Sequence, residues 1–168
     1  MHHRAIKLYK YHQWANEKFF EHLKELPSDV YENKITSVFN SISQVIKHLY
    51  QTDGLWLSVI SGDSFKETMS IVNKLQKQTK EKSLQQMQHL YDELSEQYLG
   101  FFEDEEDLDK EIEIDHPEFG KLKTPISKLV QHVVNHGTYH RGNLTAMLRQ
   151  QGYPGVPNDY LIYLYKVK

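Results

Sequence analysis

The chain has 168 residues and carries 23 acidic against 20 basic side chains, so its formal net charge at pH 7 is −3. This length fits one domain, residues 1–168, with a sizeable core, and the lack of a basic excess argues against nucleic-acid binding. The chain has no cysteine, which excludes disulfides, zinc ribbons and a thiol nucleophile of its own. It shows neither a signal peptide nor an apolar run long enough to span a bilayer, so we expect a cytoplasmic protein without a membrane partner.

Two long amphipathic helices are predicted in the first third of the chain. Residues 2–26 have mixed three- and four-residue apolar spacing, and the Pro-Ser-Asp run that follows ends this helix. We interpret Trp14 and Asn16 in it as core packing and a satisfied amide, or as support for a functional site. The second helix begins at Asn40 or Ser41 and ends at residues 61–62, and it is apolar around most of its circumference.

Asp53 lies well inside the apolar arc of this second helix. A buried carboxylate costs several kcal/mol unless it is paired or hydrogen-bonded. We therefore expect Asp53 to have a partner, for which an imidazole or an indole N–H would serve. Most of the ten histidines, His12 among them, have no spacing that distinguishes them from surface residues.

The middle of the chain predicts one further long helix. Residues 63–82 are polar with weak apolar spacing, and we interpret them as a loop with room for one short helix. Ser83 caps a third helix that continues to about residue 102. An acidic run follows, and residues 111–123 are interpreted as a small hairpin or an extended crossover.

The fourth long helix, residues 124–151, begins with Thr124 as N-cap and Pro125 at the first helical position. Residues 158–165 are rich in tyrosine and predict a short helix that caps the bundle. Four long amphipathic segments with one long crossover indicate an all-α four-helix bundle with a short C-terminal helical segment.

Three histidines recur on the fourth helix at four-residue intervals. On a helical wheel His140 lies in the apolar stripe, His136 lies at its edge, and His132 is turned toward solvent. Residues four apart are neighbours on a helix, so His136 and His140 can reach one metal ion. Gly137, on the apolar face between them, leaves room for a neighbouring backbone or a ligand.

A third imidazole is available from the second helix, where His48 lies at the edge of the buried arc. Three neutral imidazoles leave an open coordination position, as a catalytic Zn, Ni, Co or Fe site does, and Mn is a further candidate. The nucleophile would then be a metal-bound water or thiol. Asp53 and Asn135 are candidates for the acceptors that orient the ligand rings. The alternative is that the histidines are merely packed or exposed.

Three motifs resemble the DinB-like family of small helical proteins, and the resemblance covers essentially the whole chain. They are Tyr11-x-x-Trp14-Ala15-Asn16, His48-x-x-x-x-Asp53-x-x-Trp56, and His132-Val133-Val134-Asn135-His136-Gly137-Thr138-Tyr139-His140-Arg141-Gly142. The resemblance implies an up-up-down-down bundle, a homodimer, and the metal ligands His48, His136 and His140. The last two are the pair that the wheel selects, whereas His48 depends more on the resemblance.

Characterised members of the family resemble thiol-dependent enzymes, namely bacillithiol S-transferases and mycothiol-dependent maleylpyruvate isomerases. The resemblance therefore implies transfer of a low-molecular-weight thiol to an electrophilic small molecule. Arg141 is then interpreted as a clamp for carboxylates of the thiol cofactor, or otherwise as a helix-end salt bridge. Two alternatives stay open: a metal-dependent hydrolase, weakened because the glutamate of His-Glu-x-x-His is missing, and a non-enzymatic, stress-related binding protein.

Overall fold

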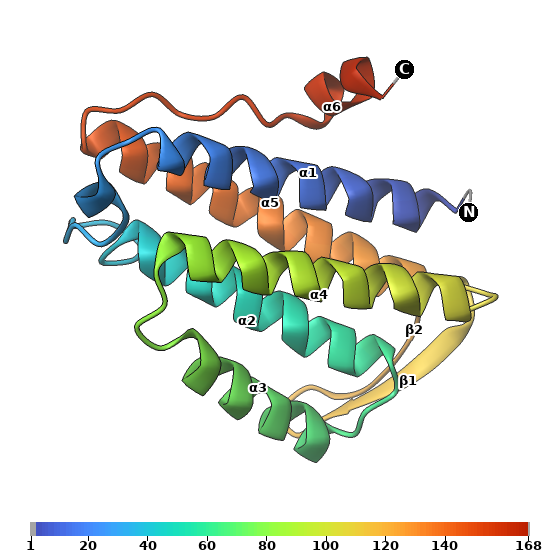
Figure 1. Ribbon diagram of the computed structural model, residues 1–168. Coiled ribbons are helices and arrows are strands. Elements are labelled where there is room, and N and C mark those ends of the chain that lie inside the picture. The colour runs from blue at the N-terminus through green and yellow to red at the C-terminus, as the bar shows by residue number, and fades with distance from the viewer. Residues whose placement is uncertain (1–2, 168) are drawn as a thin grey trace.

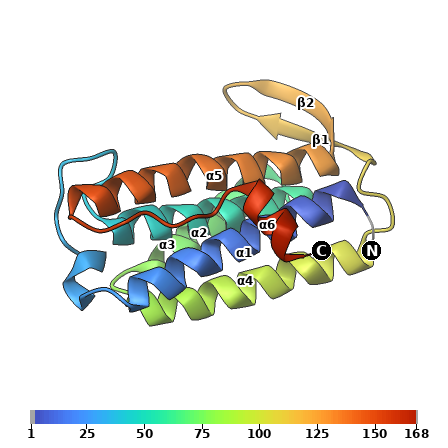
Figure 2. The same cartoon turned by 90° about the horizontal axis from the view of Figure 1, so that it is seen from above.

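The computed structural model describes residues 3–167 and has four long helices packed side by side (Figures 1 and 2). These are α1 (Arg4–Lys24), α2 (Ile42–Ile60), α4 (Leu84–Asp104) and α5 (Ile126–Gln150). Helices α1 and α2 each pack against both α4 and α5, and the buried apolar side chains of all four meet in one core. The predicted all-α bundle is confirmed.

The direction of the helices differs from the predicted up-up-down-down order. Tyr91 on α4 donates a hydrogen bond to the carbonyl of Ile46 on α2, and Tyr98, two turns later, donates to the carbonyl of Asp53. Helices α2 and α4 are therefore parallel, and Figure 1 shows α1 and α5 running the opposite way. The order along the chain is up-down-down-up, so the predicted topology was wrong.

The reason for this order lies in residues 63–82, which were predicted to be a loop with room for one short helix and which hold a longer helix. Residues Phe65–Thr79 form α3, a helix of 15 residues that packs against α2 and returns the chain to the end where α2 began (Figure 1). At 1.5 Å per residue, α3 spans about 22 Å, which lets α4 start beside the start of α2. Ser64 and Glu67 form a capping box at its N-terminus.

Other helix ends follow local chemistry. The hydroxyl of Ser41 accepts from the backbone N–H of Gln44, so Ser41 rather than Asn40 is the cap of α2. Ser83 forms a capping box with Gln86, which confirms the predicted cap of α4. A 3₁₀ turn, Ser28–Tyr31, follows α1.

The chain between α4 and α5 forms a hairpin of β1 (Glu111–His116) and β2 (Gly120–Pro125), paired antiparallel. The start of α5 was predicted one residue early, because Thr124 belongs to β2 and pairs with Ile112. Pro125 occupies the N-cap position without a side-chain hydrogen bond. The N–H groups of Ile126 and Ser127 instead donate to backbone carbonyls before the hairpin. These two backbone hydrogen bonds thus replace the expected threonine cap.

The predicted C-terminal helix is α6 (Tyr160–Lys166), which lies along α1. Its Tyr163 packs against Trp14 and Tyr11 on α1. Within residues 3–167 no helix combines the length and the apolarity that crossing a membrane requires.

Candidate metal centre

Three histidines from two helices face one another where α2 packs against α5. His136 and His140 lie one turn apart on α5, and His48 projects from α2. Each offers one ring nitrogen such that all three nitrogens lie within 4.8 Å of one another. The Nε2 atoms of His136 and His140 are 3.1 Å apart, and the His48 and His140 rings are 4.7 Å apart between centroids.

The donor set and its spacing fit a divalent metal ion. In a tetrahedral site with metal–nitrogen bonds of 2.0–2.1 Å, two ligand nitrogens are about 3.3 Å apart, close to the separation between His136 and His140. The Nδ1 atom of His136 is buried and has no hydrogen-bond partner among the described residues. Asn143 Nδ2 lies 3.3 Å from His140 Nδ1, and with its amide rotated Asn143 would accept from that nitrogen. The Nε2 lone pair of His140 would then face the site.

The surroundings keep the imidazoles in the form that binds metals. Burial, and next the neighbouring His140, lowers the pKa of His136 from 6.5 to about 4. Burial is also the largest cause that lowers the pKa values of His48 and His140, although Asp53 partly opposes it in both. Three neutral rings therefore present lone pairs at pH 7 without first releasing protons.

The rings of Phe39 and His132 border the three site histidines. Phe39, from the segment that precedes α2, packs its ring 5.3 Å from His48 and 5.6 Å from His140. His132 is exposed, as the helical wheel predicted, and its ring lies between Trp56 at 4.7 Å and His136 at 6.2 Å. Sequence reasoning missed Phe39 because it lies in an irregular segment without periodicity.

A buried polar chain lies behind the histidines, and it contains the partner expected for Asp53. Asp53 is 2% exposed, and its Oδ2 accepts from Nε2 of His12, 2.8 Å away. His12 is 1% exposed, so its interpretation as a surface residue was wrong. Asp53 Oδ1 has no partner among the described residues, and Asp53 also acts on the pKa values of all three site histidines. It contributes negative charge behind them.

Gly137 makes the space that His12 occupies. A Cβ atom on residue 137 would lie 2.3 Å from His12 Cε1 and 2.4 Å from His12 Nδ1, which is closer than non-bonded atoms approach. The predicted close approach at this glycine is therefore real, and the group that approaches is a side chain of α1.

Arg141 closes this polar chain from the side of α5. Its Nη1 donates to Asn16 Oδ1 at 2.8 Å and to His12 Nδ1 at 3.2 Å, while Nη2 donates to Thr138 Oγ1 at 3.0 Å. The guanidinium also lies over the Tyr11 ring, and burial lowers the pKa of Arg141. Because Arg141 is 1% exposed and lies within the helix, this geometry argues against both the anion clamp and the helix-end salt bridge.

Of the other residues predicted to support the site, Asn16 and Trp14 are packed against neighbouring elements and Asn135 is not. Asn16 is buried and holds Arg141, which fits the predicted buttress, and Trp14 packs against α6. Asn135 is exposed, and the asparagine in contact with a site histidine is Asn143. The i, i+3 spacing between His140 and Asn143 was the signal in the sequence that could have identified it.

Comparison with known proteins places these features in context. The family model described as the DinB family matches residues 1–167. The protein named DinB from Bacillus subtilis (strain 168) is 47% identical to this chain over 164 residues, which cover 98% of this chain and 95% of that protein.

Proposed function

The chain belongs to the DinB family, and from that premise we propose that it is a divalent-metal-dependent enzyme. The proposed reaction transfers a low-molecular-weight thiol, such as bacillithiol, to an electrophilic small molecule. The observation that carries this proposal is the cluster of three imidazole nitrogens within 4.8 Å of one another.

Three histidine ligands leave a coordination position open for a reactant. A divalent ion held there would lower the pKa of a bound thiol, so that a thiolate is available at neutral pH. Imidazole donors suit Zn, Ni, Co and Fe better than Mn, which prefers oxygen ligands.

The chain's own contribution is positioning. Because it has no cysteine, the sulfur must arrive with a small molecule. The sulfur lone pair forms the new bond to the electrophilic carbon, the leaving group departs with its electron pair, and the thiol proton passes to solvent. His48, His136 and His140 would hold the ion, and Phe39 would cover the histidines on one side.

The hydrolase alternative has less support in the geometry. Hydrolysis by the zincin route needs a carboxylate base beside the metal ligands. The metal-ligand cluster found among residues 3–167 contains only histidines, and the buried Asp53 is hydrogen-bonded to His12.

A turnover assay tests the proposal. Protein reconstituted separately with Zn²⁺, Ni²⁺, Co²⁺, Fe²⁺ and Mn²⁺ is given bacillithiol and 1-chloro-2,4-dinitrobenzene, and thioether formation is followed. We expect turnover with at least one metal and a loss of at least about a hundredfold in His136→Ala. The control is His89→Ala, which removes an exposed histidine of α4 that contacts none of the site histidines and retains activity. Thiol-independent release of products from ester substrates would instead support the hydrolase, and inactivity with all five metals would contradict the proposal.

A further inference from the structure

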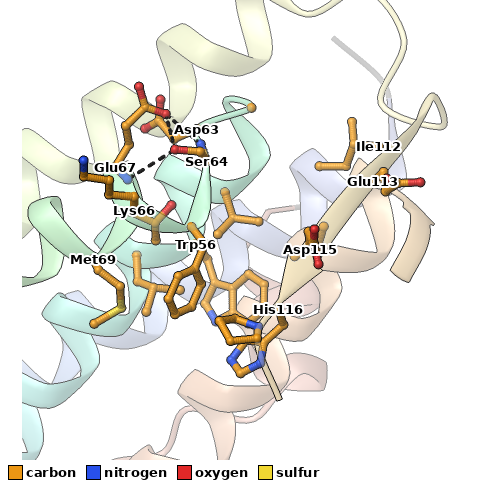
Figure 3. Close-up of a pocket in the computed structure, with 17 residues that line it drawn as sticks. Trp56, Asp63, Ser64, Lys66, Glu67, Met69, Ile112, Glu113, Asp115 and His116 are labelled. Carbon is orange, nitrogen blue, oxygen red and sulfur yellow. Dashed lines mark hydrogen bonds between the residues drawn. The ribbon is translucent and has the colours of Figure 1, made fainter. Parts of the chain in front are cut away.

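A large cavity lies outside the four-helix core, beside the metal centre rather than within it. It is bordered by the C-terminal half of α2, the first turns of α3 and strand β1, and it opens to solvent (Figure 3). Its volume is about 940 Å³, in the range of pockets that hold drug-sized molecules. Its apolar walls include Trp56, Val59, Phe65, Met69, Ile112 and Ile114.

This cavity exists because two elements are added to the bundle. Along β1 the half-buried residues Ile112, Ile114 and His116 alternate with exposed acidic ones, so the inner face of the strand is directed toward α2 and α3. Phe65 at the start of α3 meets the His116 ring at 5.4 Å between centroids. Helix α3 and the hairpin therefore form a shared wall, which the bundle alone would not supply.

The charges around the cavity select against anions. Three of the lining carboxylates, those of Asp63, Glu67 and Asp115, stand against Lys66 and one histidine, whereas the fourth, Glu113, is paired with Lys121 at 2.7 Å. Figure 3 shows the Glu113 side chain directed away from the cavity. An occupant of the interior therefore meets apolar side chains and a negatively charged rim, which suits an uncharged aromatic or aliphatic group.

One wall of the cavity leads to the metal centre. On α2, Trp56 lies two turns after His48 on the same face, about 12 Å along the helix axis. From Trp56 the contacts continue to the His132 ring at 4.7 Å and from there to the His136 ring at 6.2 Å. A molecule with an apolar part in the cavity can thus extend along this face toward the site histidines.

We propose that this cavity binds the uncharged, apolar part of the electrophilic acceptor. That the bound molecule is the acceptor of the thiol rests on the proposed function, whereas the binding of a neutral apolar molecule in the cavity does not. Acceptor preference is then determined by α3 and β1, and the metal ligands need not contact the apolar part.

The first test measures binding to metal-free protein, so it does not depend on catalysis. The chain has two tryptophans, and Trp14→Phe leaves Trp56 as the only one to report on the cavity. We expect the neutral probe 6-propionyl-2-dimethylaminonaphthalene to quench Trp56 and to bind at least about tenfold more tightly than the anionic 1-anilinonaphthalene-8-sulfonate. Equal or tighter binding of the anion would overturn the proposal.

Charge substitution and competition complete the test. Met69 is 38% exposed, so Met69→Glu should fold and weaken the neutral probe at least about fivefold. The control Leu161→Glu, on exposed α6, leaves binding within twofold. The aromatic electrophile 1-chloro-2,4-dinitrobenzene should displace the probe and iodoacetamide should not. Failure of this displacement would overturn the acceptor role even if the thiol transfer occurs, and displacement without any turnover would refute the proposed function alone.

Discussion

The close approach at Gly137 gives the sharpest prediction about the buried polar chain. Gly137→Ala would gain up to about 1 kcal/mol of helix propensity. Against that, the new Cβ would lie 2.3 Å from His12 Cε1 and 2.8 Å from Arg141 Nη1, and overpacking of this kind costs about 1–3 kcal/mol. A displaced His12 also leaves the buried Asp53 without its partner, which costs about 3–5 kcal/mol when complete. We expect partial displacement and a net loss of about 2–4 kcal/mol.

The assay is equilibrium urea denaturation of metal-free protein, followed by circular dichroism. Gly142→Ala is the matched control, because it lies on the same helix and a Cβ there meets none of residues 3–167 within 4 Å. We expect that control to be unchanged or more stable by up to about 1 kcal/mol. Equal stabilisation of both variants would refute the conclusion that His12 fills the space beside Gly137.

Three further predictions address the bundle, its surface and its assembly. Removing the buried carboxylate with Asp53→Ala should lower the free energy of unfolding by about 1–3 kcal/mol, measured by urea denaturation, because the buried N–H of His12 loses its acceptor. Burial, then Asp92 and Glu21, raises the pKa of Glu17, so the ionised group destabilises the fold at pH 7. Glu17→Gln should therefore stabilise by roughly 0.2–0.5 kcal/mol at pH 7, and its advantage in thermal melts should disappear as the pH falls through the raised pKa to below 4.5. The expected homodimer should sediment at twice the mass of the chain, and a concentration-independent monomer would contradict it.

The helices that the sequence predicted correctly are those whose apolar faces are strong. The starts of α2 and α4 were predicted from the serines near them, Ser41 and Ser83, because a serine hydroxyl is a good acceptor for the free N–H groups at a helix start. The juxtaposition of His136 and His140 followed from helical periodicity alone. His48 reaches them only if α2 packs against α5 in one particular register, which periodicity does not specify. The family resemblance is what identified His48 as the third ligand.

Helix α3 was predicted only as room for one short helix, because few of its side chains are buried and two of those are threonines. Its buried residues are Thr68, Leu75 and Thr79, so a search for apolar spacing finds little. The capping box of Ser64 and Glu67 was the available signal. The wrong helix order came from the family resemblance, whereas in the structure α3 returns along the bundle and thereby makes α2 and α4 parallel.

The burial of His12 and Arg141 was equally hidden. Each is a polar residue whose place in the core depends on a partner more than forty positions away, as the hydrogen bonds from His12 to Asp53 and from Arg141 to Asn16 show. Such pairing leaves no periodic pattern in one sequence. Gly137 was the indirect sign, because a glycine within a helix marks a close approach without naming what approaches.

His48, His136 and His140 are expected to bind one divalent ion together. The most direct test is elemental analysis of protein that has been reconstituted with metal and freed of excess. We predict close to one ion per chain in the unchanged protein and in His132→Ala, and far less in His48→Ala and in His136→Ala/His140→Ala, with folding checked by circular dichroism. Metal content that is equal in all four proteins, or absent from the unchanged protein, would contradict the account.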